Sequence, residues 1–323
     1  MSATRLIVLA VWLLCGFETA RATFSLAEAF RGDDFYHKWN WETFNDPTNG
    51  RVDYVDMKTA KKLNLTEVKD GAFLMSADDY STVPTSARGR KSVRISSKGS
   101  WADSLIVLDL THMPEGCATW PAFWTLSAAG PWPTGGEIDI LEGVHLQEQN
   151  LASQHTRPGC TMSDHRQMKG TPTSNNCDTA VNYNQGCGVS FSKKNSYGAA
   201  FNKAGGGYYV MQRTKQNGVQ VWFWSRSDPL LPLDIKAGSP VVVPTPLWGL
   251  PEASFPPDNC DYDQHFDAHR MVFDLTFCGD WAGAVWPMSG CGAGSCVDHV
   301  NGNPKAFSKA YWEVNSVNVY TPL

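Results

Sequence analysis

Three carboxylates stand within six residues of an otherwise apolar run, in "GGEIDILEGV" at positions 135–144. They are Glu137, Asp139 and Glu142, and no Lys or Arg lies between positions 135 and 154 to neutralise them. A carboxylate in apolar surroundings shifts its pKa or needs a partner, so such a cluster is costly. Two carboxyl groups about 5 to 5.5 Å apart can cleave a glycosidic bond with retention, one as nucleophile and the other as acid and base. An edge strand with solvated acids is the alternative interpretation.

The spacing of the acids predicts a β-bulge. In a regular strand Glu137 and Asp139 share one face, whereas Glu142 would point the other way. If the apolar residues between the acids face a core, one extra residue at 140–141 returns Glu142 to the face of the other two. Asp139 would then accept a hydrogen bond and, by repelling further negative charge, keep one of its neighbours protonated.

Three tryptophans precede the acids, in "TWPAFW" and "GPWP". Flat indole faces suit the C–H face of a sugar ring, while acids and amides bind its hydroxyls. Trp124 and Trp132 are candidates for this role, and Trp132 stands in a Pro-Gly loop, where we expect it to be exposed. Burial statistics assign Trp120 to the core instead.

Short β-rich runs must position these residues. Helical periodicity is almost absent, and the runs are bounded by Gly, Pro, Asn or Asp clusters. This pattern favours a sandwich of antiparallel sheets. The runs are "RVDYVD", "SVRIS", "SLIVLDL", "EIDILEG", "YYVMQRT", "VQVWFWS", "RMVFDLTF" and "SVNVYT".

Three segments are expected to lie outside the sheets. Helices are predicted over 56–65 ("DMKTAKKLNL") and 303–312 ("NPKAFSKAYW"). The stretch 228–258 holds eight prolines and is predicted to be a long surface loop pinned by Cys260. The runs after this loop are too few to build a second core, so 23–323 is predicted to be one domain.

Residues 1–22 are predicted to be a secretory signal peptide. Arg5 precedes an apolar stretch at 6–14 that is too short to span a bilayer, and Ala20-Arg21-Ala22 is typical of a cleavage site. No later segment is apolar and long enough to anchor the chain in a membrane. We therefore expect a secreted, extracellular protein.

Cysteine content agrees with export. Removing the signal leaves an even number of cysteines, which suits disulfides in an oxidising compartment. Their pairing does not follow from spacing, although Cys177 with Cys187 and Cys291 with Cys296 could close short loops. A zinc site would need paired C-x-x-C spacings, and none occurs. The eight are Cys117, Cys160, Cys177, Cys187, Cys260, Cys278, Cys291 and Cys296.

The charge balance excludes some partners. The sequence has 27 basic and 32 acidic residues. Positions 1–22 hold two basic residues and one acidic residue, so the remainder carries a net charge of −6. A mildly acidic chain binds nucleic acid or an anionic membrane poorly. The sequon "NLT" makes Asn64 a candidate surface glycosylation site.

Several motifs together resemble glycoside hydrolase family 16, and within it the secreted fungal endo-β-1,3(4)-glucanases called laminarinases. They are "TWPAFW", "GGEIDILEGV", "QHT", "TFCGDWAG" and "AYWEVNSVNVY", so the likeness runs from about residue 23 to the C-terminus. The related lichenases and plant xyloglucan enzymes are similar but have one residue fewer, E-x-D-x-E. The resemblance implies a concanavalin A-like β-jelly-roll of two antiparallel sheets with a concave substrate cleft, and retaining double-displacement chemistry.

The resemblance also implies roles for individual residues. Glu137 matches the nucleophile, Glu142 the acid/base and Asp139 the residue that assists the nucleophile. His155 in "SQHT" matches a cleft histidine near the acid/base. The remaining substrate-binding matches are Trp124, Trp132, Trp281 in "CGDWAG" and, more weakly, Arg94 in "SVRIS". The segment "TLSAAGP" after Trp124 departs from the family pattern, because it lacks an acidic residue common there.

No cofactor is expected. The segment "DNCDYDQHFDAH" at 258–269 has four Asp and two His, but it lacks the spacing of an EF-hand or a zincin. We interpret it as a polar loop beside a disulfide. The resemblance leaves open a structural calcium on the convex side, as in some relatives.

The predicted function is therefore hydrolysis of β-1,3 bonds in laminarin-like glucans, with branched and mixed β-1,3-1,4-glucans as further candidates. The partner would be the polysaccharide, and the protein a monomer. A cell-wall glucan transglycosylase using the same site is one alternative. A non-catalytic β-glucan-binding lectin is the other, but binding alone does not need two carboxylates at that separation.

Overall fold

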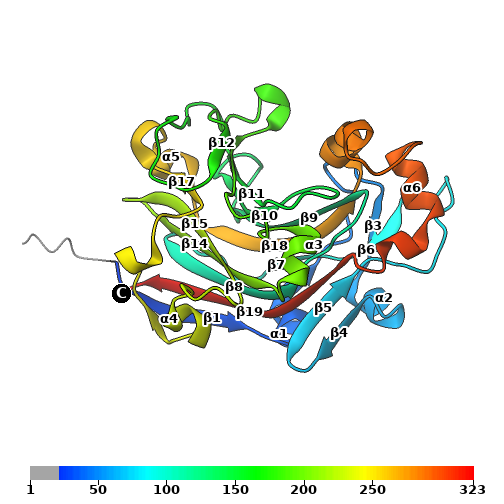
Figure 1. The fold of residues 1–323 in the computed structure, drawn as a ribbon, viewed down its shortest axis with the longest axis horizontal. Coiled ribbons are helices and arrows are strands. Elements are labelled where there is room, and N and C mark those ends of the chain that lie inside the picture. Colours follow the sequence, from blue (N-terminus) through cyan, green and yellow to red (C-terminus); the bar gives the residue numbers. More distant parts are fainter. Residues whose placement is uncertain (1–21) are drawn as a thin grey trace, which may run out of the picture.

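The computed structural model describes residues 22–323, which form two antiparallel β-sheets stacked face to face (Figure 1). All but the last residue of the predicted signal peptide lies outside the described residues. The first sheet has nine strands in this part of the chain. Its order is β16 (Val241–Val242), β1 (Phe24–Phe30), β19 (Tyr311–Pro322), β8 (Ser104–His112), β14 (Gly207–Thr214), β15 (Gly218–Ser225) and β17 (Ala253–Phe255), with β5 (Ala72–Ser76) pairing β19 and β4 (Thr66–Lys69) pairing β5.

The second sheet carries the acidic row and has eight strands among the described residues. Loops rise on both sides of its outer face, around β12 (Thr171–Ser174) and α5 (Tyr262–His265) on one side and α6 (Cys296–Gly302) on the other (Figure 1). Its order is β12 (Thr171–Ser174), β13 (Cys187–Ser190), β11 (Leu151–His155), β10 (Glu137–Glu142), β9 (Thr119–Ser127), β18 (His269–Phe277), β7 (Arg94–Ser97) and β2 (Trp39–Trp41). A short parallel pair, β3 (Val52–Tyr54) and β6 (Arg90–Ser92), stands apart. The predicted antiparallel sandwich is confirmed.

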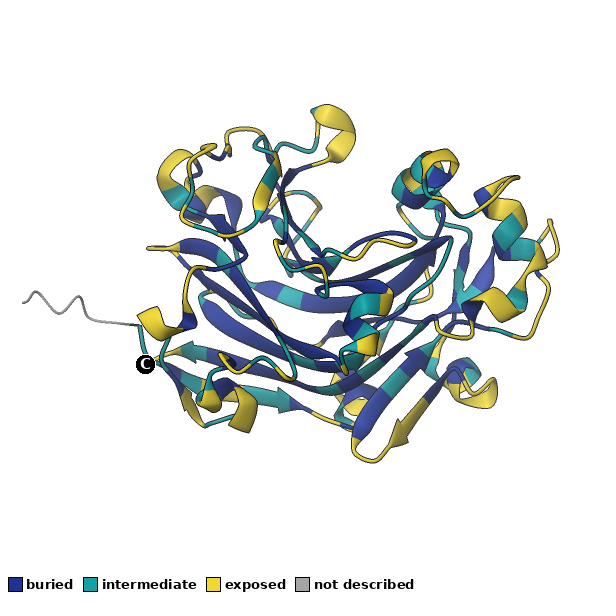
Figure 2. Cartoon of the chain, viewed as in Figure 1, coloured by how far each residue is buried: buried dark blue, intermediate teal, exposed yellow. Residues whose placement is uncertain are grey.

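The core fills the space between the sheets. Phe35 stacks on Phe73 at a centroid distance of 4.6 Å, and Phe123 on Phe273 at 4.4 Å. Burying each such ring contributes roughly 1.5–3 kcal/mol to folding. Figure 2 shows the strands largely buried, while the exposed residues gather in the loops and short helices.

The helices of the described chain are short. The predicted helix at 56–65 is confirmed as α2 (Met57–Lys62), and Asp56 caps it by accepting a hydrogen bond from the Thr59 N–H at 2.7 Å. The second prediction was largely wrong. Only Pro304–Phe307 is helical, as one 3₁₀ turn, because from Tyr311 the chain enters β19 and pairs with β5. The other α-helices are α1 (Asp34–His37), α3 (Gly198–Lys203), α4 (Leu233–Ala237), α5 and α6. No helix of the described residues is long and apolar enough to cross a membrane.

The proline-rich segment 228–258 runs over the outer face of the nine-stranded sheet. It places Trp248 edge-on to Trp222 and Trp224, at centroid distances of 5.5 and 5.7 Å. It also contributes two short strands, β16 and β17, which the prediction of an unpaired loop did not include. The following strands, β18 and β19, lie in different sheets.

The eight cysteines of the described chain form four disulfides. Cys177 pairs with Cys187, as the spacing allowed, and Cys160 with Cys260, which pins the end of the proline-rich segment. The pairing of Cys291 with Cys296 was wrong. Helix α6 begins at Cys296 and directs it to buried Cys278, while Cys291 pairs with Cys117.

Candidate active site

Strand β10 contains the predicted bulge. Against β9, Asp139 pairs with Trp124 but Leu141 pairs with Phe123, so the register shifts at Ile140. The register against β11 shifts between Asp139 and Glu142 as well. Ile138, Ile140 and Leu141 are at most 1% exposed and belong to the core between the sheets. The three acids therefore share the outer face of the sheet, and the bulge returns Glu142 to it.

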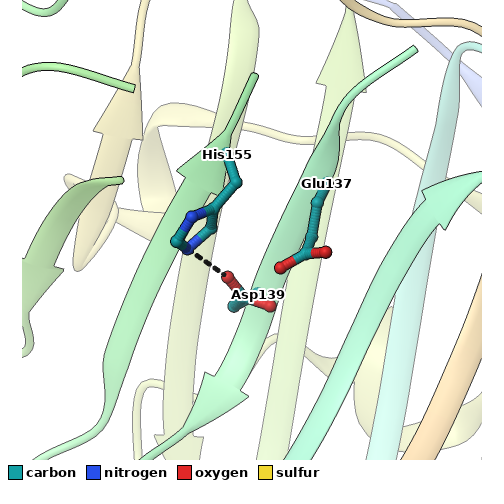
Figure 3. Close-up of side chains that lie close together, drawn as sticks. All are labelled: Glu137, Asp139 and His155. Atoms are coloured by element: carbon teal, nitrogen blue, oxygen red, sulfur yellow. Dashed lines mark ion pairs between the residues drawn. The ribbon is translucent and has the colours of Figure 1, made fainter. Parts of the chain in front are cut away.

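Asp139 is the centre of a buried polar cluster (Figure 3). Its Oδ2 accepts a hydrogen bond from Ser153 Oγ at 2.8 Å and lies 3.3 Å from His155 Nε2. One carboxylate oxygen from each of Glu137 and Asp139 and one ring nitrogen of His155 all lie within 4.8 Å of one another. Among the described residues, no other His, Cys, Asp and Glu side chains form a group of three that could hold a metal ion. The hydrogen bond that we expected Asp139 to accept is thus present.

His155 is held as a cation. It stands on β11 directly opposite Glu137, and its Nδ1 lies 3.0 Å from Asn184 Oδ1. Burial opposes its protonation, but the hydrogen bond to Asp139 and the charges of the neighbouring acids outweigh burial and raise the pKa of His155 to about 10. The structure ties this histidine to Asp139 and Glu137. Its charge also acts on Glu142, which the resemblance matches to the acid/base.

Glu137 receives a hydrogen bond from Trp132. The indole Nε1 donates to Oε2 at 2.6 Å, and Trp132 is 47% exposed, as its Pro-Gly loop predicted. Burial of the carboxyl, together with the charge of Asp139, raises the pKa of Glu137 to about 7. His155 and the Trp132 hydrogen bond act in the opposite direction and favour the ionised form.

Glu142 also has a raised pKa, which favours its protonated form. Burial, followed by the charge of Asp139, raises its pKa well above the ordinary value. The indole N–H of Trp120 donates to Glu142 Oε1 at 2.8 Å, and the ring packs edge-on against Trp281 at 5.6 Å. The assignment of Trp120 to the core was therefore wrong: the ring is half-buried on the outer face and orients a carboxyl group.

A second polar cluster lies across β9, on β18 and β7. Asp274 accepts hydrogen bonds from Trp124 Nε1 at 2.8 Å and Tyr54 Oη at 3.1 Å. Burial raises its pKa to about 6, against the opposing effect of Arg94. Arg94 pairs with Glu42 at 2.8 Å, and its guanidinium lies 5.1 Å from the Trp124 ring centroid.

The sequence did not identify Asp274. In β18 it lies between the buried residues Phe273 and Leu275, so its outward direction could be read from the alternation. That it lies near the acidic row depends on β18 pairing with β9 and β7, which no local pattern predicts.

The candidate glycosylation site lies away from the row. Asn64 is exposed in the turn that follows α2, beside β4 and β5 of the other sheet (Figure 1), and its glycosylation stays a prediction. The segment 258–269, interpreted as a polar loop beside a disulfide, contains the Cys160–Cys260 disulfide and the one-turn helix α5, capped by Asp261 through the Gln264 N–H. It contacts the chain just before the acidic row, where the Asp267 N–H donates to the Gly135 carbonyl oxygen at 3.2 Å.

The comparisons with known proteins decide the family. The model of the XgeA-like catalytic GH16 domain matches residues 39–320. The chain belongs to glycoside hydrolase family 16 and is a glycoside hydrolase. It is 43% identical to a "Probable glycosidase" from Schizosaccharomyces pombe, over 92% of this chain and 69% of that protein. It is 41% identical to a "Probable endo-1,3(4)-beta-glucanase" from Aspergillus fumigatus, again over 92% of this chain but only 45% of the relative's length.

Solved structures of the same family are also similar. Laminarinase 16A from Phanerochaete chrysosporium, with two β-glucans (6-O-glucosyl-laminaritriose) in its donor and acceptor sites, has a TM-score of 0.90 and 45% identity, covering 93% of this chain and all of that chain. An elongating family 16 β-1,3-glucosyltransferase has a TM-score of 0.84 and 37% identity, covering 92% of this chain and all of that one. The jelly-roll fold of this family is therefore the fold of the chain.

Proposed function

We propose that this chain is a retaining endo-β-1,3(4)-glucanase that cuts β-1,3 bonds in laminarin-like glucans. The observation that carries the proposal is the bulge in β10, which sets Glu137 and Glu142 on one face with Asp139 between them. The names of the Aspergillus relative and of laminarinase 16A support the substrate class. Branched and mixed β-1,3-1,4-glucans are further candidate substrates.

Each glutamate has one role in the first step. Ionised Glu137 attacks the anomeric carbon, while protonated Glu142 gives its proton to the leaving glycosidic oxygen. The bond from C1 to that oxygen breaks, and a glycosyl ester forms on Glu137. The Trp132 N–H and the His155 cation stabilise the ionised form of Glu137, which is the form that attacks.

The second step reverses the role of Glu142. Once Glu137 is a neutral ester, its charge no longer raises the pKa of Glu142, so the Glu142 carboxyl can act as a base. It takes a proton from water, and the water oxygen attacks C1 from the side that the leaving group vacated. The ester breaks, and the sugar leaves with its original β configuration.

The aromatic residues around the acids are suited to a glucan chain. Trp132 is exposed beside Glu137, and Trp120 donates to Glu142 and packs against Trp281. Indole faces bind sugar rings by stacking, and the Asp274 and Arg94 cluster offers polar groups for hydroxyls. We propose that the polysaccharide lies across β10 with these residues as its subsites.

Substituting each glutamate by its amide tests the proposal. E137Q and E142Q keep the size of the side chain, so both variants should fold with a melting temperature close to that of the wild type. Each should lose laminarin hydrolysis by about 10³-fold or more, because a nucleophile or an acid is missing. A reducing-sugar assay on laminarin, lichenan, carboxymethylcellulose and xyloglucan measures both the loss and the preference. Full activity of both variants would refute the assignment.

Glucosyl transfer is a second candidate, supported by the similarity to the elongating β-1,3-glucosyltransferase. The same glycosyl ester would then be attacked by a sugar hydroxyl in place of water. Product analysis with laminarioligosaccharides at high acceptor concentration separates the two. Products longer than the substrate would indicate transfer, and only shorter ones hydrolysis.

We also propose that the protein acts outside the cell as a monomer. Four disulfides in the described chain are typical of an oxidising compartment, and the predicted signal at 1–22 would direct export. The fungal relatives named as endoglucanases agree with an extracellular protein.

A further inference from the structure

The buried side chain of Asn150 forms hydrogen bonds to the bulge that brings Glu142 to the outer face of the sheet. The Glu142 N–H donates to Asn150 Oδ1 at 3.0 Å, and Asn150 Nδ2 donates to the Ile140 carbonyl oxygen at 2.9 Å. Asn150 directly precedes β11, the strand that pairs with β10. A carboxamide therefore binds the two backbone groups on either side of Leu141, where strand pairing is irregular.

Hydrogen bonds also hold the backbone of Asn150 in place. Its N–H donates to Ser196 Oγ at 3.0 Å, and its carbonyl oxygen accepts from the Phe191 N–H at 2.9 Å. Ser196 Oγ in turn donates to the Lys193 carbonyl oxygen at 2.6 Å. Asn150 is fully buried, and both of its backbone groups and both side-chain atoms have partners. A satisfied buried network of this kind is rigid.

A neutral amide of this size can make both contacts, because it carries one acceptor and one donor side by side. The Glu142 N–H can only donate and the Ile140 carbonyl can only accept, so the orientation of the amide is determined by its partners. An ionised carboxylate would repel the carbonyl oxygen. Alanine would leave two buried backbone groups without these partners, and an unpaired buried polar group is destabilising.

We propose that Asn150 is a positioning residue for the acid/base Glu142, an inference that rests on the function proposed above. Asn150 holds the backbone of Glu142 through its N–H, and the Trp120 N–H holds the carboxyl group of the same residue. Without Asn150 the bulge can relax, and the carboxyl leaves the position from which it protonates the glycosidic oxygen. A displacement of about 1 Å at a reacting group can cost about 100-fold in rate.

This role predicts a dependence on the leaving group. A glucan needs protonation of its leaving oxygen, whereas dinitrophenolate departs without it. For N150A we expect kcat/KM to fall about 100-fold on laminarioligosaccharides but by less than about tenfold on 2,4-dinitrophenyl β-laminaribioside. E142Q should show the same split more strongly. A purely structural role would lower both values by the same factor, as the fraction of folded enzyme falls.

N150D gives a second readout if N150A folds poorly. A protonated carboxyl at this position could accept from the Glu142 N–H and donate to the Ile140 carbonyl, whereas the ionised form could not. The kcat/KM of N150D on laminarioligosaccharides should therefore approach that of the wild type in acid and fall at a lower pH than in the wild type. If the basic limb of kcat/KM for N150D stays at the pH of the wild type, the proposal is contradicted.

N318A is the matched control, because Asn318 is another buried asparagine, on β19 of the other sheet. For N318A, the ratio of kcat/KM on laminarioligosaccharides to kcat/KM on 2,4-dinitrophenyl β-laminaribioside should equal that of the wild type. The inference is overturned if N150A keeps the wild-type ratio while E142Q changes it. If the wild type cleaves neither substrate, the proposed function fails first, and the inference fails with it.

Discussion

At the scale of single residues, the protonation states of the site are set by immediate neighbours. Burial and the charge of Asp139 raise the pKa of both glutamates, while His155 and one tryptophan N–H, from Trp132 for Glu137 and from Trp120 for Glu142, act in the opposite direction. The resulting pKa is about 7 for Glu137 and well above the ordinary value for Glu142. His155 contributes through its charge, which Asp139 maintains.

The variant H155Q should shift the pH dependence of catalysis upward. The His155 cation lowers the pKa of both glutamates, so both pKa values rise when the charge is removed. Glu137 must be ionised, so the acid limb of kcat/KM moves to higher pH. Glu142 must be protonated, so the basic limb moves in the same direction.

Profiles of kcat/KM against pH on laminarioligosaccharides measure this shift. H112Q serves as the control, because His112 lies on β8 of the other sheet, stacked on Tyr311, and its loss should leave both limbs in place. If the acid and basic limbs of the H155Q profile stay in place or move to lower pH, the histidine does not act through its charge.

At the scale of elements, the position of the extra residue in β10 decides which face the acids occupy. Removing Ile140 would leave the acids in regular alternation, E-x-D-x-E, with Leu141 still facing the core. Removing Ile138 would make Glu137 and Asp139 adjacent, so one of them would point into the core. Both variants lack one isoleucine, and they differ only in where that residue lies relative to the bulge.

We expect the variant lacking Ile140 to fold and to keep activity within about 100-fold of the wild type, because the acidic row stays on one face. The variant lacking Ile138 should lose activity and a large part of its thermal stability, since a buried unpaired carboxylate is costly. Thermal unfolding and a laminarin assay compare the two. Equal behaviour of both deletions would contradict the role given to the bulge.

The bulge itself was predictable from sequence, whereas its partners were not. The number of residues between Asp139 and Glu142, with apolar residues to be buried, required one extra residue. Asn150 gave no signal, because a single Asn before a strand is common in loops. Trp120 was misassigned because average burial does not tell which tryptophan has an N–H within reach of a carboxyl.

At the scale of the whole molecule, the site depends on strands that are distant in sequence. Arg94, Glu142 and Asp274 come from β7, β10 and β18, whose order in the sheet, with β9 between β10 and β18, is set by long-range pairing. The sandwich could be predicted from strand-like runs and turn residues, but strand order and disulfide partners could not. Cys296, for example, pairs across to Cys278 and not with its near neighbour Cys291.

The central claim is that this assembly cleaves β-1,3-glucan with retention through Glu137 and Glu142. Time-resolved ¹H NMR of laminarioligosaccharide hydrolysis by the wild type tests it most directly, because it identifies the anomer released first. We predict that the β anomer appears first and that the α anomer follows by mutarotation, with neither released by E137Q. Initial release of the α anomer would contradict the account.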